Sequence, residues 1–166
     1  MRSVIRHIAT LIAVILLIAL ASCGWHSRGG DVTAPPDDGI RIASLNTHYI
    51  MLDRQDGPWT VEGWDRRKGA MAEVLRNVDA DILAFQEMES FRRGDGSTNL
   101  TYDFLRGQFP GYSAGATGDW QDFPTTQPVF FRSDRFEEVD QGWFFFSETP
   151  DTIYSCSFDG SFPAFA

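Results

Sequence analysis

Hydrophobic and polar residues recur along the chain in a pattern that predicts alternating strands and helices from Ile40 onwards. The run "IRIASLN" at 40–46 alternates apolar and polar residues, which is typical of a strand. Apolar residues at helical spacing predict a helix over 64–78, which should end at a turn over 79–81. The run "DILAFQ" at 81–86 then predicts a second, buried strand. Because a helix joins the two strands, we expect them to be neighbours in one sheet.

The second part of the pattern begins with another helix and continues with strands. Asn99 is a suitable N-cap for a helix over 100–108, and Pro110 and Gly111 should end it. Four further strands are predicted, at "GYSAGA" (111–116), "PVFFRS" (128–133), "FEEVDQ" (136–141) and "WFFFSE" (143–148), with a turn at Gln141-Gly142. The order of elements predicts an α/β fold, and no internal repeat is visible.

The strand at 81–86 is unusual because it finishes in charge, with Gln86 followed by Glu87 and Glu89. Burying a carboxylate is costly unless a partner compensates it, so acids at this position are either solvated loop residues or site residues. Asn46 ends the neighbouring strand and should face the same crevice, unless its side chain only caps its own turn. A hard cation such as Mg²⁺ needs only one or two protein carboxylates, and Glu87 can supply one.

Composition indicates one globular domain, and charge narrows the range of partners. The chain has 166 residues, 43% of them hydrophobic and 14% aromatic, which is ample for a packed core. The formal net charge of -9 argues against broad attraction to nucleic acid or anionic lipid. It leaves open small phosphorylated substrates that a cation bridges to the protein.

The first 22 residues have the pattern of an export signal. Arg2 and Arg6 precede an uncharged apolar run of about 14 residues, shorter than the roughly 20 that a membrane span needs. The sequence Leu-Ala-Ser-Cys at 20–23 resembles the bacterial lipoprotein lipobox, which implies cleavage and lipidation at Cys23. The alternative is a plain signal peptide with a chance cysteine. By resemblance to enterobacterial lipoprotein sorting rules, Gly24 in place of an aspartate favours the outer over the inner membrane.

Three segments therefore organise the chain: a lipoprotein signal peptide at 1–22, a flexible Gly-, Pro- and Asp-rich tether at 23–39, and a folded region at 40–166. Lipidation of Cys23 leaves Cys156 as a single thiol in an oxidising compartment. We expect Cys156 to be buried and inert; the alternative is that it awaits a partner from another chain.

The strand ending at Asn46, the stretch "WDRRKGAMAEVLRNVDADILAFQE" and the later "QPVFFRSDRFEEVDQGWFFFSETPD" together resemble the N-terminal half of the endonuclease/exonuclease/phosphatase family. The resemblance covers most of 40–151. It implies a DNase I-like four-layer β-sandwich of two mixed sheets flanked by helices, of which this chain supplies only the N-terminal half. It also implies a monomeric, Mg²⁺-dependent phosphoester hydrolase, with Mn²⁺ as the alternative metal, in which Glu87 is the metal ligand and Asn46 its catalytic neighbour.

Several other residues are weaker candidates. Arg132 follows an aromatic strand and is a candidate substrate contact, although a surface arginine is an equal alternative. His48 is interpreted as a loop histidine without a catalytic role, and Glu89 as either a neighbour of the site or an exposed acid. The segment 125–127 lacks an acid that many relatives have, and Phe131 replaces a frequent tyrosine, so substrate contacts are in doubt.

The resemblance also predicts what is missing. Family members carry an Asp-x-Asn strand end, an Asn-Thr-His strand and a terminal Asp-His pair, and none of these follows Asp151. We therefore expect the intact protein to be a lipid-anchored hydrolase of a nucleic acid, lipid, inositol or sugar phosphoester, and this chain alone to be inactive. The rival hypothesis is a non-catalytic surface-binding lipoprotein or pseudoenzyme on the same scaffold, suggested by its many aromatic residues.

Overall fold

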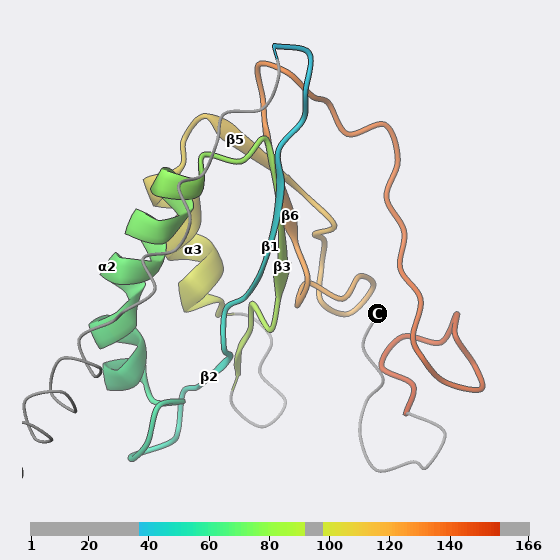
Figure 1. The fold of residues 1–166 in the computed structure, drawn as a ribbon. Helices are drawn as coiled ribbons and strands as arrows, with labels where there is room; N and C mark the ends of the chain where they lie inside the picture. The colour runs from blue at the N-terminus through green and yellow to red at the C-terminus, as the bar shows by residue number, and fades with distance from the viewer. Residues whose placement is uncertain (1–36, 92–97, 157–166) are drawn as a thin grey trace, which may run out of the picture. The chain divides into compact units, whose positions relative to one another are not determined.

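The computed structural model describes residues 37–91 and 98–156, which belong to one compact unit spanning Ala34–Ala166. Its centre is a mixed four-stranded sheet in the order β1-β3-β6-β5 (Figure 1). The strands are β1 (Ile42–Asn46), β3 (Ile82–Gln86), β5 (Tyr112–Gly115) and β6 (Val129–Arg132). Strands β1 and β3 pair in parallel, and β6 runs antiparallel to both β3 and β5. The predicted strand–helix–strand unit and the neighbouring positions of its strands are confirmed.

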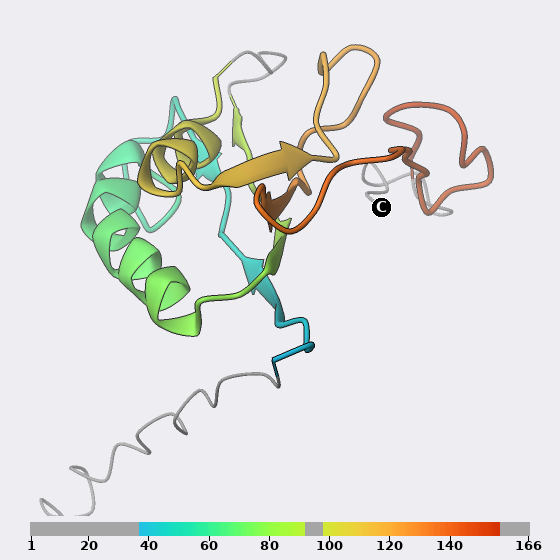
Figure 2. The same ribbon diagram turned by 90° about the horizontal axis from the view of Figure 1, so that it is seen from above.

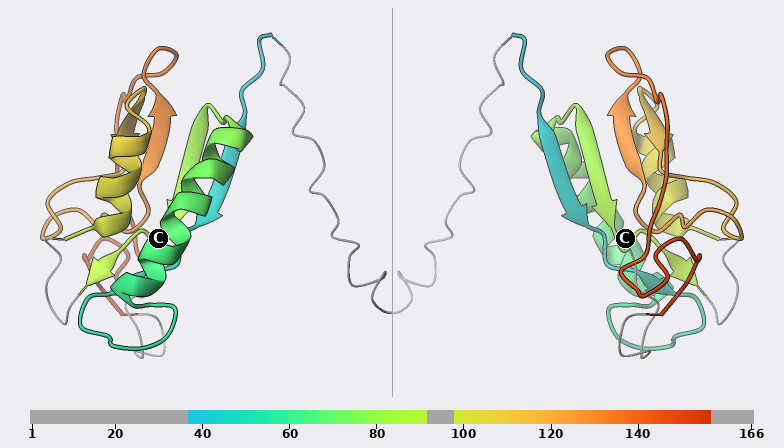
Figure 3. Two further views of the ribbon diagram at one scale, coloured as in Figure 1. Left: turned by 90° about the vertical axis from the view of Figure 1, so that its left-hand side faces the viewer. Right: turned by 90° about the vertical axis from the view of Figure 1, so that its right-hand side faces the viewer.

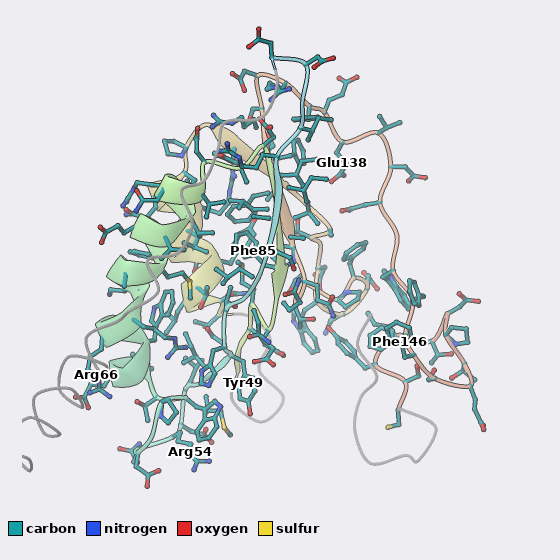
Figure 4. All side chains as sticks on the ribbon, in the orientation of Figure 1. Tyr49, Arg54, Arg66, Phe85, Glu138 and Phe146 are labelled. Atoms are coloured by element: carbon teal, nitrogen blue, oxygen red, sulfur yellow. The ribbon has the colours of Figure 1, made fainter. Side chains whose placement is uncertain are left out.

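Helices α2 (Val61–Val78) and α3 (Leu100–Gln108) both lie on one face of this sheet, as Figures 1 and 2 show from two directions. Between helices and sheet lies the core, where Phe85 packs edge-on against Phe130 with ring centroids 5.1 Å apart (Figure 4). Alternate residues of β3 point to this core, and Leu83 and Phe85 are both buried there. The helix face of the sheet is therefore the hydrophobic face, as the buried run predicts.

Helix α2 begins at Val61, three residues before the predicted start. Thr60 is its N-cap, and the Thr60 Oγ1 accepts a hydrogen bond from the Gly63 N–H at 2.9 Å. Gly63 allows the preceding loop to approach, because a Cβ atom at this position would lie 2.6 Å from the Pro58 carbonyl oxygen. The helix ends at Asp79, which has a left-handed backbone and whose N–H donates to the Leu75 carbonyl.

An ion cluster holds the start of β3. The buried carboxylate of Asp81 accepts the Arg41 backbone N–H at 2.8 Å and the Arg135 guanidinium at 2.5 Å. Arg132 adds a contact at 3.4 Å to the same carboxylate and also pairs with Asp79. The backbone bond and the two arginines lower the pKa of Asp81, with the Arg41 N–H as the largest cause. This cluster ties β1, β3 and β6 together at one end of the sheet.

The face of the sheet opposite the helices is more exposed, and its character changes along the strands. Near the strand starts it carries Ile42, which is 66% exposed, and partly buried Ile82. At the strand ends the same face is polar, where the Ser44 hydroxyl and Gln86 carboxamide lie 3.0 Å apart in a hydrogen bond. The outer face is thus apolar at one end and polar at the other.

A second, two-stranded sheet extends beyond the ends of β1 and β3. It pairs β2 (Ile50–Met51) with β4 (Ser90–Phe91) in parallel, and the sequence pattern did not indicate it. Figure 3 shows β2 and β4 beyond the ends of the longer strands, beside the first turn of α2. The segment after each long strand is therefore fixed by backbone pairing rather than free in solvent.

The strands predicted at 136–141 and 143–148 are absent, because the described residues offer these segments no neighbouring strand to pair with. Their backbone contacts are local, such as the Phe145 N–H donating to the Pro150 carbonyl at 2.9 Å. The predicted burial of Cys156 is also wrong, since the thiol is exposed and unpaired in the described part of the chain. No helix among the described residues is long and apolar enough to cross a membrane. The predicted signal peptide, the lipidated Cys23 and most of the tether lie outside those residues.

Candidate active site

The parallel pairing of β1 and β3 brings the two predicted site segments together. Asn46 lies opposite Gln86 in the sheet register, so both strands end at the same level. Directly after them, the Thr47 N–H and hydroxyl both donate to the Gln86 carbonyl, at 2.8 Å and 3.1 Å. Thr47 is fully buried, which anchors the chain at this point. Asn46 and Glu87 are thus held by neighbouring strands at one edge of the sheet.

Glu87 adopts a backbone conformation that is costly for a residue with a side chain. Its φ is +54°, in the left-handed region, and the Glu89 N–H donates back to the Glu87 carbonyl at 2.8 Å in a tight turn. Such conformations cost about 1–3 kcal/mol and persist at functional sites when the surroundings impose them. The carboxylate is partly exposed and makes no hydrogen bond or ion pair to the described residues. It is therefore available to a ligand.

The carboxamide of Asn46 has one of its two ends occupied. Its Oδ1 accepts a hydrogen bond from the His48 backbone N–H at 2.8 Å, so Asn46 does cap its own turn. The Nδ2 amide makes no hydrogen bond to the described residues, so it can donate to a phosphate oxygen. The Oδ1 keeps a second lone pair beside the hydrogen bond that it accepts.

His48 and Glu89 follow this edge in the chain, each two residues after a candidate site residue. His48 has a φ of +61°, and its ring stacks on Trp59 with centroids 5.6 Å apart and planes inclined by 18°. Burial raises the pKa of Glu89, and burial together with the Glu89 charge raises the pKa of the nearby Tyr154. Glu89 is half-buried rather than a fully solvated acid.

The structure does not bring Arg132 to this edge. Arg132 belongs to the ion cluster at the start of β3, whereas Glu87 follows the end of the same strand. Its guanidinium also lies over the Tyr112 ring, 5.4 Å from the centroid. These contacts give Arg132 a role in holding the sheet together.

A metal can be tested against the donor set of this edge. No group of three or more His, Cys, Asp or Glu side chains within 37–91 and 98–156 is placed to hold a metal ion. One partly exposed carboxylate still matches the needs of Mg²⁺, which keeps several waters and takes further oxygens from a phosphate. Glu87 fits that description, and a site of this kind suits a hard cation better than zinc.

The sequence patterns missed two residues that shape the site, Trp59 and Arg67. Trp59 stacks on the His48 ring, and Arg67 of α2 donates to the His48 carbonyl at 2.6 Å. The available signal was the position of Trp59 immediately before the capping Thr60, which marks the point where the loop joins the helix.

Comparisons with known proteins give a fold but no closer relationship. A scan against protein-family models finds no match, and a search of curated proteins also finds none. Among solved structures, an endonuclease/exonuclease/phosphatase from Bacteroides vulgatus matches with a TM-score of 0.53 and 23% identity, over 74% of this chain and 42% of that one. An endonuclease/exonuclease/phosphatase family protein from Bacteroides thetaiotaomicron matches with a TM-score of 0.51 and 25% identity, over 72% of this chain and 40% of that one.

A third structure, a mannosyl-6-phosphatase from Bacteroides thetaiotaomicron, matches with a TM-score of 0.51 and 24% identity, over 73% of this chain and 41% of that one. The chain thus spans about two fifths of the length of each structure it matches, with 42%, 40% and 41% covered. At this identity the likeness concerns the fold. The chain is therefore an N-terminal-like part of the DNase I-like α/β fold that endonuclease/exonuclease/phosphatase proteins share.

Proposed function

We propose that this chain contributes the metal-binding edge of a Mg²⁺-dependent phosphoester hydrolase. The observation that carries the proposal is the pair of strained, non-glycine residues at one sheet edge: His48 at φ +61° and Glu87 at φ +54°. Each follows a strand of the parallel pair, and ligands in open α/β sheets bind at the carboxyl ends of the strands. Strain of this kind is expected where a side chain must be held toward a ligand.

The chain's own residues would bind and orient the substrate. Glu87 would hold the cation, which when bound neutralises charge on the transferred phosphoryl group. The Asn46 Nδ2 amide, whose partner oxygen is held by the His48 N–H at 2.8 Å, would donate to a phosphate oxygen. Because this amide is already oriented, its hydrogen bond to a developing negative charge would need little reorganisation.

The substrate class follows from the chemistry of the edge only as far as a phosphoester. The net charge of -9 disfavours polymeric nucleic acid, because no excess of cations offsets the phosphate backbone. One structural neighbour is named a mannosyl-6-phosphatase, which makes sugar phosphates the first substrates to test.

The test begins with metal binding by the chain itself. In a ¹⁵N-labelled sample, substoichiometric Mn²⁺ should broaden the amide signals of Thr47 and Glu87 before others, and Mg²⁺ should compete. Glu87→Gln keeps the shape of the side chain and removes its charge, so the broadening should disappear. Glu89→Gln, two residues away, is the control and should retain it. Broadening that is equal in Glu87→Gln and the parent would place the metal elsewhere and sink the proposal.

Catalysis is tested in a longer protein that contains this chain together with the remainder of the DNase I-like fold. There, Glu87→Gln should forfeit about 4 kcal/mol of transition-state stabilisation, roughly a thousandfold in rate. The melting temperature should hardly change, because the Glu87 carboxylate has no partner among the described residues to lose. A rate equal to that of the parent would mean that Glu87 is only a solvated loop acid.

A second candidate function is non-catalytic binding at a surface. Phe144 and Phe146 are 51% and 62% exposed, and their rings pair edge-on with centroids 5.2 Å apart. Phe146 lies on the side of the sheet away from the helices (Figure 4). Exposed aromatic side chains of this kind are common at binding surfaces. If Mn²⁺ leaves Glu87 unaffected while Phe144→Ser abolishes capture of the chain by cell-envelope fractions, this function replaces the hydrolase.

We also propose that Cys23 carries a lipid that holds the protein at the bacterial cell envelope, in the outer membrane. The proposal rests on the sequence Leu-Ala-Ser-Cys at 20–23 and the apolar run before it. An anchored enzyme would act on substrates that reach the membrane surface.

A further inference from the structure

Arg67 of α2 is joined to the loop that follows β1 at two points. Its Nη2 donates to the His48 carbonyl at 2.6 Å, and its Nη1 donates to the Pro58 carbonyl at 2.7 Å. The guanidinium also lies over the Trp64 ring, 5.4 Å from the centroid. One side chain therefore connects the beginning of the loop, its end and the helix.

The environment of Arg67 is unfavourable for a cation whose only role is to hold a loop against a helix. The guanidinium has no ion-pair partner among the described residues, its Nε is buried without a hydrogen bond, and desolvation lowers its pKa. Arg67 is partly buried, and a partly buried charge without a counter-charge is less favourable than a solvated one. Two short hydrogen bonds with fixed geometry are what arginine adds.

The backbone of His48, whose N–H and carbonyl belong to two successive peptide groups, connects Arg67 to the candidate site. Its carbonyl is held by Arg67, its ring stacks on Trp59, and its N–H donates to the Asn46 Oδ1 at 2.8 Å. These contacts keep His48 at a φ of +61°, a conformation that a residue with a Cβ rarely adopts without support. The backbone of His48 therefore links the Arg67 guanidinium to the Asn46 carboxamide.

We propose that Arg67 is a positioning residue for the site, and that it acts through His48 to keep the Asn46 Nδ2 amide facing the ligand. The proposal rests on the proposed function for its purpose, but it makes a separate statement about the conformation of Asn46. Arg67 contacts neither substrate nor metal in this scheme. Both the positive charge of Arg67 and its two separate Nη donors matter, because lysine can reach only one of the two carbonyls.

The experiment compares Arg67→Met and Arg67→Lys with Arg66→Met as the matched control. Arg66 is the adjacent residue on the same helix and points away from the sheet (Figure 4). Among the described residues it pairs only with Glu62, at 2.6 Å. The readout is the set of three-bond NMR couplings from the backbone to the Asn46 Cγ, which report whether its χ1 angle occupies one rotamer or several. Thermal melts are recorded beside them.

The parent and Arg66→Met should show a single Asn46 rotamer. Arg67→Met should show averaged couplings and an apparent affinity for inorganic phosphate, measured with Mg²⁺ present, that is weaker by roughly tenfold, about 1.4 kcal/mol. Arg67→Lys should lie between the two, because it restores the charge and one hydrogen bond. If Arg67→Met does not fold, Trp59→Leu removes the ring beneath His48 and should give averaged couplings as well.

A single Asn46 rotamer in a folded Arg67→Met variant would overturn the proposal, since the loop would then hold His48 without the guanidinium. A single rotamer in folded Trp59→Leu would do the same when Arg67→Met is lost. Failure of the proposed function gives a different result, namely no Mn²⁺ broadening at Glu87 in the parent. That result does not alter the coupling measurement, so the two failures can be told apart.

Discussion

Two glycines in α2 lead to opposite expectations for the same substitution. A Cβ atom on Gly63 would lie 2.6 Å from the Pro58 carbonyl oxygen, 3.0 Å from its carbon and 3.2 Å from its Cα. All three atoms are backbone, so rotation of a side chain cannot relieve the contact. A Cβ on Gly69, in the exposed middle of the helix, would meet nothing within 4 Å.

The magnitudes follow from these contacts. A carbon–oxygen contact is comfortable at about 3.3 Å or more, so Gly63→Ala must displace the loop by roughly 0.7 Å. Such overpacking costs about 1–3 kcal/mol, against a gain of up to about 1 kcal/mol from replacing glycine in a helix. Gly69→Ala has only the gain. The two variants, identical in composition, should therefore differ by about 2 kcal/mol in the free energy of unfolding, with Gly63→Ala below the parent and Gly69→Ala above it.

Urea unfolding followed by tryptophan fluorescence checks this expectation. With a slope of about 2 kcal/mol per molar urea, the two midpoints should lie about 1 M apart. Gly63→Ala should also loosen the hydrogen bond between Arg67 and the Pro58 carbonyl and average the Asn46 rotamer, whereas Gly69→Ala should not. Equal midpoints, or a stabilised Gly63→Ala, would refute the close approach of the loop to the helix.

Three further expectations concern other parts of the chain. Asp81→Asn should reduce the loss of stability in acid, because the lowered folded-state pKa of Asp81 means that its stabilising charge is present at neutral pH and is lost as the pH falls through that pKa. The urea midpoints at pH 7 and pH 3 should therefore lie closer together in the variant than in the parent. An unchanged difference between the two midpoints would contradict this expectation. Ile42→Lys, on the exposed outer face, should reduce concentration-dependent light scattering without lowering the melting temperature, and unchanged scattering would mean that another surface drives association. Cys23→Ser in the bacterial host should abolish incorporation of labelled fatty acid and release the protein from the membrane fraction; persistent labelling would exclude lipidation at Cys23.

Much of the fold could be predicted from periodicity because the elements concerned are stabilised by local signals and by one clear apolar face. The helix over 100–108 and its Asn99 cap have the predicted bounds, since the Asn99 Oδ1 accepts the Tyr102 N–H at 3.0 Å. The strand pair ending at Asn46 and Gln86 is also confirmed.

The segment around Phe145 shows where periodicity is insufficient. The sequence predicted a strand over 143–148, and burial does alternate there, with Phe145 buried and its two neighbours exposed. A strand also needs a partner, however, and a one-dimensional pattern does not identify one. The candidate site was predictable to the same extent. Charge at a strand end indicated Glu87. Arg67 binds backbone carbonyls, which every residue has, so the types of its partner residues do not indicate the contact.

The separation between the two ends of β3 has a consequence for how the protein responds to its solution. The strand has 5 residues, so Asp81 at its start and Glu87 after its end are separated by more than roughly 16 Å. The Debye length at physiological ionic strength is about 8 Å, so a charge at one end is largely screened from the other. Protonation of the ion cluster and loading of a cation at the opposite edge should therefore be independent equilibria. The pH at which Asp81 becomes protonated should therefore be the same whether the Glu87 edge is loaded with a cation or emptied by a chelator.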